Sequence, residues 1–243
     1  QCDWSSDVCS SDLVIIENKV LDERSAFQSD PLAAHGFRQS IGIGGTDRKG
    51  LWLSLFCYEN AALPAMVEKW AADADGVNCI VTEGLALAQI EKIAGKKMPA
   101  GTCVEIGQLA LHSIPVLDLK QYDRLLWSCD ANFVRGEDSF VRAQLAARPL
   151  VWQAYPQEAD AHLAKAAAFR DRYCSGMTQA AATAGKALFD GWNRQSAGCA
   201  AHWPAFRREL DACKANAVAW AGQIAENGDL AANLAKFCED RLE

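Results

Sequence analysis

The stretch Asn132-Phe133-Val134-Arg135-Gly136-Glu137-Asp138-Ser139-Phe140 decides how this chain folds. An apolar run from Leu125 leads into it and predicts a strand that ends near Val134. The residues from Phe140 to Ala147 then have the apolar spacing of an amphipathic helix. Glycine, arginine and two carboxylates stand between them. The segment therefore predicts a strand that delivers a polar turn into the start of a helix.

This polar turn has the chemistry of an anion site. The first backbone amides of a helix have no partners within the helix and attract negative charge. Arg135 stands beside them and can bind a phosphate through two N–H groups. A plainer alternative fits the same residues, because any βα unit has a polar turn, Asp138 or Ser139 can cap the helix, and an arginine can lie at the surface. The turn by itself leaves both interpretations open.

Short apolar runs alternate with longer amphipathic ones from Leu51 onward, which indicates βα units over a parallel sheet. Strands are predicted over residues 51–57, 77–82, 103–111, 129–134 and 149–153. Helices are predicted over residues 61–75, 85–93, 118–126 and 159–173. We expect an α/β fold, with a Rossmann-like parallel sheet flanked by helices over 51–174 and a helical C-terminal region over 175–243 that packs on it.

Polar residues follow each predicted strand and should gather at one edge, since ligands bind at the carboxyl ends of parallel strands. These are Tyr58-Glu59-Asn60, Glu83-Gly84, Arg135 to Ser139 and Tyr155 to Gln157. No Gly-x-Gly-x-x-Gly follows a strand and no P-loop motif occurs, which argues against dinucleotide oxidoreductases and P-loop nucleotidases. A nucleoside diphosphate held by an arginine and helix amides suits a metal-independent glycosyltransferase of the two-domain GT-B type.

Composition limits the partners and the compartment. The net charge is -7, which argues against a general nucleic-acid or anionic-membrane surface. No apolar run reaches the roughly 18 residues that a bilayer span needs, so we expect a soluble, cytoplasmic protein. The four histidines have no metal-ligand spacing, and no metal cofactor is expected. Four cysteines within apolar runs are predicted to be reduced core residues: Cys57, Cys79, Cys103 and Cys129.

The signature stretch resembles that of the elongation factor P protein-arginine rhamnosyltransferases. Further blocks similar to the family occur in the same order, at Leu53 to Asn60, Tyr122 to Trp127 and Pro149 to Gln157. The resemblance runs from about Val14 to the C-terminus. It implies transfer of L-rhamnose from dTDP-β-L-rhamnose to an arginine side chain of elongation factor P, with inversion at the anomeric carbon.

The resemblance also implies roles for individual residues. Asp138 and Ser139 would present backbone amides to the diphosphate, with Arg135 nearby, and Glu137 would be the functionally sensitive carboxylate facing the sugar or ribose. Glu137 could instead be an ordinary carboxylate that the helix dipole favours. The nucleoside and sugar would contact four further residues: Phe56, Tyr122, Tyr155 and Gln157. On pattern alone, Phe56 could equally be a core residue of the first strand, and Tyr155 a residue at the sheet edge.

Two departures from the family affect the predicted base pocket. Val116 stands where the family usually has a phenylalanine, and Leu119 where a glutamine is more usual. We therefore expect weaker binding of thymine, or another side chain in its place. Neither change touches the diphosphate turn.

The resemblance covers only the donor-binding half of such an enzyme. Residues 1–13 resemble a spurious leader and are expected to be disordered, and residues 14–50 are interpreted as an interdomain remnant. The carboxylates that would orient the acceptor arginine belong to an N-terminal domain that nothing before Val14 resembles. We expect this chain to bind the donor and to be inactive alone. Binding of elongation factor P as a partner would need the N-terminal half. The alternative is a non-catalytic Rossmann-like module that binds a nucleotide or a protein.

Overall fold

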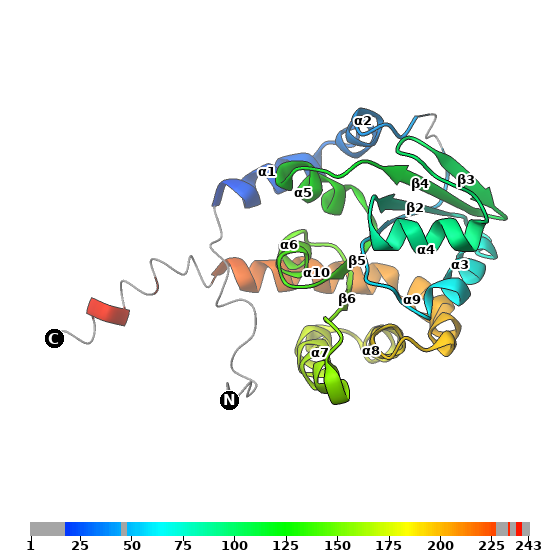
Figure 1. The fold of residues 1–243 in the computed structure, drawn as a ribbon. Helices are drawn as coiled ribbons and strands as arrows, with labels where there is room; N and C mark the ends of the chain where they lie inside the picture. The colour runs from blue at the N-terminus through cyan, green and yellow to red at the C-terminus, as the bar shows by residue number, and fades with distance from the viewer. Residues whose placement is uncertain (1–17, 45–47, 227–232, 234–236, 240–243) are drawn as a thin grey trace.

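A computed structural model describes residues 18–44, 48–226, 233 and 237–239 (Figure 1). The leader predicted over 1–13 lies outside the described residues. Six strands form one sheet: β1 (Leu51–Leu55), β2 (Val77–Thr82), β3 (Cys103–Ile106), β4 (Leu109–Ile114), β5 (Ala131–Arg135) and β6 (Leu150–Gln153). Their order is β3-β4-β2-β1-β5-β6, and every neighbouring pair is parallel except β3 with β4. The predicted α/β fold is confirmed.

Helices surround this sheet. The first six α-helices are α1 (Asn18–Ser29), α2 (Ala33–Ser40), α3 (Leu63–Ala71), α4 (Leu85–Ala94), α5 (Leu119–Ser128) and α6 (Asp138–Leu145). The C-terminal ones are α7 (Ala161–Tyr173), α8 (Gln179–Asn193), α9 (Trp203–Arg208) and α10 (Leu210–Glu226). Short 3-10 turns are η2 (Glu158–Asp160), η3 (Cys174–Gly176) and η4 (Ala197–His202). The predicted helical C-terminal region is therefore present as far as Glu226.

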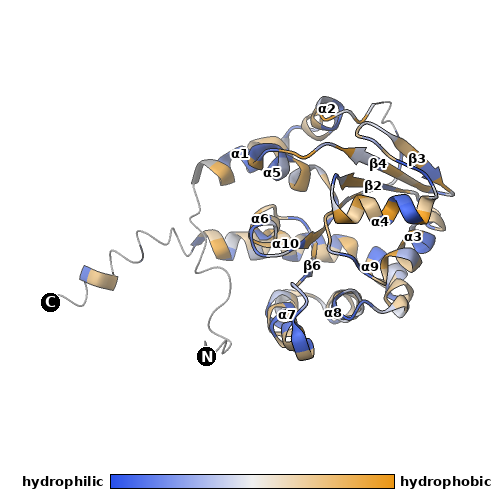
Figure 2. Ribbon diagram, in the orientation of Figure 1, coloured by the Kyte–Doolittle hydropathy of each residue, from blue (hydrophilic) through white to orange (hydrophobic). Residues whose placement is uncertain are grey.

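The two faces of the sheet have different cores because side chains alternate along each strand. Leu53 and Leu55 of β1 belong to the larger core, which includes residues of α3, α4 and the C-terminal helices. Trp52 lies on the other face, in a smaller core with residues of α2 and α5. Figure 1 shows α1, α2 and α5 together on one side of the sheet, away from α3 and α4. In Figure 2 the buried strand β2 has hydrophobic colours, whereas the edge strand β3 is partly hydrophilic.

Phe133 joins the signature strand to the C-terminal helices. Its ring makes edge contacts with Trp70 of α3 at 5.5 Å and with Trp192 of α8 at 5.0 Å between ring centroids. Trp70 in turn contacts Trp203 of α9 at 5.8 Å. All four side chains are buried, and aromatic pairs in this arrangement add to the burial of apolar area. The C-terminal helices therefore complete the core beneath β5.

The extended region predicted over residues 103–111 is a hairpin. β3 and β4 are antiparallel and are joined at Gly107 and Gln108. Gly107 has a φ of +56°, and a Cβ added there would lie 2.5 Å from the carbonyl oxygen of Ala71. The Gln108 amide donates to that same oxygen at 2.8 Å, which holds the turn against the end of α3. The sequence prediction missed this turn because a single glycine inside an apolar run has little local signal.

The predicted reduced core cysteines are free, but one of them is not in the core. Cys57, Cys79 and Cys129 are buried, whereas Cys103 is exposed. Cys103 belongs to the edge strand β3, in which no residue is fully buried. Its prediction as a core residue is therefore wrong, because an apolar run says nothing about whether a strand lies at the edge of a sheet.

A histidine is buried on the face of the sheet that α2 covers. The His112 ring stacks on Trp52 with centroids 5.4 Å apart, and the guanidinium of Arg38 lies 4.2 Å from the centre of the Trp52 ring. Burial first, and the positive charges of Arg48 and Arg38 next, lower the pKa of His112 to about 4. The ring is therefore neutral in the folded protein near neutral pH.

Replacing Gly107 by alanine should destabilise the protein by about 2 kcal/mol, because the added Cβ meets the Ala71 carbonyl and φ is positive. Urea unfolding measures the change. The control is Gly222→Ala, because Gly222 lies within α10 with open space around its Cβ position. That variant should be neutral or stabilised by up to about 1 kcal/mol. Equal losses in both variants would contradict the close contact at the hairpin.

Acid should destabilise the protein partly through His112. An unfolded histidine binds a proton below about pH 6.5, whereas the folded site resists protonation down to about pH 4, so stability falls as the pH drops through this window. The loss from this residue should be on the order of 2 kcal/mol. His112→Phe keeps a ring against Trp52 and removes the titration. Urea unfolding at pH 7 and pH 4.5 should show a smaller loss in the variant, and parallel losses would exclude this role.

Candidate functional site

The carboxyl ends of β1, β5 and β6 lie side by side and form the candidate site. Leu55 pairs with Phe133, and Arg135 pairs with Gln153, so the three strands end at one edge. The amide of Phe56 donates to the carbonyl of Phe133 at 2.9 Å, which extends the pairing by one residue. The loops that follow these strands therefore start from neighbouring points, as the sequence pattern predicts.

Arg135 lies against two aromatic rings at this edge. Its guanidinium carbon is 4.5 Å from the centre of the Phe56 ring and 4.5 Å from the centre of the Tyr58 ring. Tyr122 contacts Phe56 at 6.0 Å, and Tyr155 contacts Tyr58 at 5.4 Å. Within the described residues, no ion pair involves Arg135. The guanidinium therefore packs on two aromatic rings, which attract a cation but do not neutralise its charge.

The start of α6 lies directly after Arg135. Gly136 has a φ of +65°, and the indole N–H of Trp152 donates to its carbonyl at 2.7 Å. The Ser139 hydroxyl donates to the carbonyl of Arg135, which closes the turn. The amide of Val141 donates to the carbonyl of Glu137 at 3.0 Å. The amides of residues 138 to 140 precede this first bond of the helix, so no hydrogen bond within α6 uses them.

Arg142 fixes the direction of the Asp138 carboxylate. It donates to Asp138 at 3.2 Å and to both carboxylate oxygens of Asp123 at 3.0 and 2.9 Å. Burial raises the pKa of Asp123, and the hydrogen bond from Arg142 acts in the opposite direction. The pair joins α5 to α6, so the helix that carries Tyr122 and the helix that begins at Asp138 are held together.

Tyr122 contributes its ring to the site. Its hydroxyl is buried and has no hydrogen-bond partner of good geometry among the described residues. Burial raises the pKa of this phenol, and the nearby Ser139 hydroxyl acts in the opposite direction. The group therefore stays protonated, and its role at this site rests on the ring beside Phe56.

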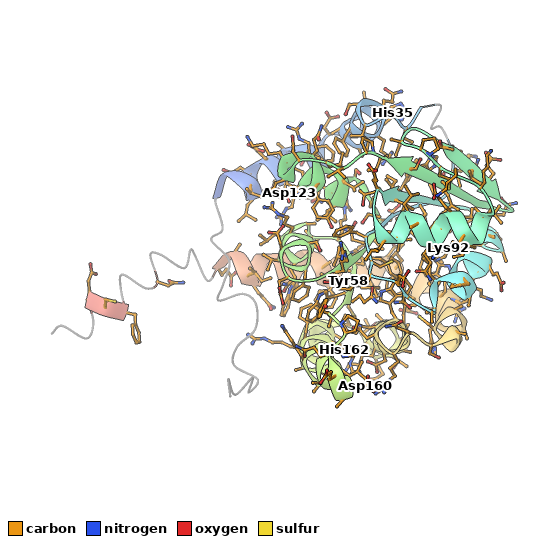
Figure 3. The ribbon with its side chains drawn as sticks, viewed as in Figure 1. His35, Tyr58, Lys92, Asp123, Asp160 and His162 are labelled. Atoms are coloured by element: carbon orange, nitrogen blue, oxygen red, sulfur yellow. The ribbon has the colours of Figure 1, made fainter. Side chains whose placement is uncertain are left out.

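Tyr155 and Gln157 lie on the loop after β6, and Tyr155 is 63% exposed. The Gln157 amide donates to Nδ1 of His162 at 3.2 Å, and the loop then passes through Ala159 and Asp160, both with positive φ. Figure 3 labels Tyr58 above His162 and Asp160, which mark the far end of this loop. The side chains of Glu137 and Gln157 are exposed. Among the described residues, neither side chain takes part in the contacts of Arg135 with the aromatic rings. The structure therefore brings together Arg135, Ser139, Phe56, Tyr122 and Tyr155, and leaves these two at the rim.

The described part of the chain contains no group of three histidine, cysteine or acidic side chains that could hold a metal ion. Over the same residues, no helix has both the length and the apolar character of a membrane span.

A sequence profile described as "Elongation-Factor P (EF-P) rhamnosyltransferase EarP" matches residues 10–239. The chain belongs to this family. It is 35% identical over 231 residues to a protein-arginine rhamnosyltransferase of Shewanella oneidensis, and the match covers 92% of this chain and 58% of that protein. It is 37% identical over 227 residues to the protein of the same name from Pseudomonas aeruginosa, with 93% and 60% covered. The chain thus spans about three fifths of the length of the curated relatives it matches.

A solved structure also resembles this one. It is titled "Structural basis for EarP-mediated arginine glycosylation of translation elongation factor EF-P", with a TM-score of 0.85 and 29% sequence identity. The match covers 99% of this chain and 81% of the other. The family that the signature stretch predicts is therefore confirmed by sequence and by fold.

Two residues of this candidate site were not predicted as site residues. Tyr58 was placed at the correct edge, but without a role, although its spacing of two from Phe56 puts both rings on one side of an extended chain. Gln153 is buried at the end of β6 and accepts a hydrogen bond from the Tyr58 amide at 2.9 Å. A buried polar residue at the end of an apolar strand is the signal that could have indicated it.

Removing Arg142 should destabilise the protein by about 2 kcal/mol near neutral pH, because Arg142→Met leaves the partly buried Asp123 carboxylate without its partner. Adding Asp123→Asn to this variant should recover part of the loss. Urea unfolding of the single and double variants measures both steps. Additive losses in the double variant would show that the two side chains do not act as a pair.

Proposed function

We propose that this chain binds dTDP-β-L-rhamnose as the donor part of an enzyme that transfers L-rhamnose to an arginine side chain of elongation factor P. Family membership supports the reaction class, since the relatives carry the name protein-arginine rhamnosyltransferase. The observation that carries the proposal is the guanidinium of Arg135, held against Phe56 and Tyr58 on the residue that precedes the start of α6 by three positions. These groups are suited to a diphosphate.

The same groups give the site its chemical role. Transfer of the sugar leaves dTDP with additional negative charge on its diphosphate. A fixed guanidinium and fixed helix amides stabilise that charge as it develops and need no reorganisation in the transition state. We therefore propose a GT-B type transfer without a metal ion, in which Arg135 and the amides of Asp138 and Ser139 assist departure of the nucleotide.

We assign the remaining predicted residues to the nucleoside and the sugar. The rings of Phe56 and Tyr122 provide apolar surface beside Arg135, and Tyr155 and Gln157 lie on the next loop. Val116 and Leu119 are 72% and 59% exposed, so they offer apolar contact without a fixed wall. Glu137 is an exposed carboxylate at the turn itself, where it can polarise a sugar hydroxyl or a group of the acceptor. We propose it as the catalytic carboxylate of this part of the enzyme.

The acceptor side belongs, in this proposal, to the part of the longer relatives that the chain does not span. A guanidinium is a poor nucleophile because its lone pairs are delocalised, and acidic groups must orient it. We propose inversion at the anomeric carbon, a cytoplasmic location, and elongation factor P as a partner that needs both parts. This chain alone is proposed to bind the donor with little or no transfer.

Calorimetric titration tests the proposal on this chain. It should bind dTDP at least tenfold more tightly than ADP, and Arg135→Met should weaken dTDP binding by tenfold or more, because it removes the cation beside the diphosphate. Arg135→Lys should recover only part of the affinity, since an ammonium lacks the planar face that rests on the rings. The control is Arg172→Met in the last turn of α7, an exposed arginine outside the site. Equal affinity for dTDP, UDP and ADP, or equal losses in both methionine variants, would count against the proposal.

A further inference from the structure

Gln153 connects two loops of the candidate site. Its side chain is 1% exposed, its Oε1 accepts from the amide of Tyr58 at 2.9 Å, and its Nε2 donates to the carbonyl of Glu59 at 3.5 Å. Its own carbonyl accepts from the amide of Gly136 at 3.4 Å. One residue at the end of β6 therefore contacts both the loop after β1 and the turn after β5.

Tyr58 depends on this contact for its place. The regular pairing of this segment ends at Phe56, whose amide donates to Phe133. Two residues later, the Tyr58 amide is held by the Gln153 side chain, and the Tyr58 ring lies 4.5 Å from the guanidinium of Arg135. A buried backbone amide without a partner is costly, so the loop favours the position in which Gln153 can accept from it. The orientation of Tyr58 against Arg135 follows from that position.

Other amide side chains hold the following residues of the same loop. Gln89 of α4 exchanges two hydrogen bonds with the backbone of Asn60, at 3.0 and 2.7 Å. The Asn60 side chain donates to the carbonyl of Trp192 at 3.0 Å, and the Asn193 side chain bonds the backbone on both sides of Gln153, at Trp152 and Ala154. All four holding side chains are uncharged amides, which donate and accept at any pH near neutrality. None of these four side chains titrates, and the charged pair of this loop, Glu59 with Lys92 at 4.0 Å, is exposed.

We propose that Gln153 is a positioning residue for the donor site. It fixes the loop after β1 so that Tyr58 holds the Arg135 guanidinium against Phe56, and this raises the affinity for the donor diphosphate. The inference rests on the proposed binding of dTDP-β-L-rhamnose. Gln153 acts through Tyr58 and does not contact the ligand itself.

A glutamate at position 153 provides a test that depends on pH. In Gln153→Glu, a protonated carboxyl can accept from Tyr58 and donate to Glu59. An ionised one still accepts from Tyr58 but repels the carbonyl oxygen of Glu59, which displaces the loop that carries Tyr58. The ratio of variant to unaltered affinity for dTDP-β-L-rhamnose should be near one at low pH and should fall tenfold or more as the carboxyl ionises. Calorimetric titration between pH 5 and pH 8 measures it. The sugar nucleotide is the probe because its diphosphate has no terminal group that titrates in this range.

Two further variants separate positioning from general damage to the fold. Asn216→Asp introduces the same chemical change at a buried amide of α10 that donates to the carbonyl of Tyr173, away from the site. It should lower the unfolding temperature on ionisation while leaving donor affinity unchanged. Gln89→Met removes two bonds to Asn60 without adding a charge, at a half-buried side chain whose loss the fold should tolerate. It should weaken donor binding by about threefold to tenfold.

The outcomes are distinct. If the unaltered chain binds dTDP-β-L-rhamnose but Gln153→Glu binds it equally at every pH, only the positioning role is overturned. The same holds if affinity falls in parallel with stability in both acidic variants. If Gln153→Glu unfolds when ionised, the donor affinity of Gln89→Met is the test. An unchanged affinity in Gln89→Met overturns the positioning role. If the unaltered chain binds no dTDP-β-L-rhamnose, the proposed function fails and this inference fails with it.

Discussion

The candidate site depends on how a single cation is held. Where an arginine is paired with a carboxylate, an incoming anion must compete with that partner. Arg135 instead rests on the faces of Phe56 and Tyr58, which stabilise its charge without neutralising it. The guanidinium is therefore held in place by the protein itself, which would lower the entropy lost in the proposed binding of a diphosphate.

Several separate contacts hold Arg135 and its neighbours in place. The parallel sheet brings the ends of β1, β5 and β6 to one edge, and the start of α6 follows within three residues of Arg135. Asp123 and Arg142 tie α5 to α6, and buried amides tie the loop after β1 to β6 and α8. The C-terminal helices contribute through Trp192, against which Phe133 packs. Arg135 and the start of α6 are close in the sequence, but the residues that hold them in place come from distant parts of the chain.

Much of this site could be predicted from the residues themselves. The polar turn from Arg135 to Ser139, the strands on either side and the edge at which their loops meet all follow from hydrophobic periodicity and the direction of parallel strands. The predictions failed where the sequence pattern does not carry the information. Cys103 lies in an apolar run, yet β3 is an edge strand, and Gly107 makes a hairpin inside that run because α3 packs against it.

The sequence by itself determined the α/β class, the family and the residue types of the site, because these depend on local periodicity and on a nearly contiguous motif. Only the tertiary structure decided which groups meet. Tyr58 and Gln153 are 95 residues apart, and their hydrogen bond exists because β1 and β6 both pair with β5. Likewise, Phe56 became a neighbour of Arg135 through strand pairing. Contacts between distant segments depend on how the chain packs, and a single sequence does not state that packing directly.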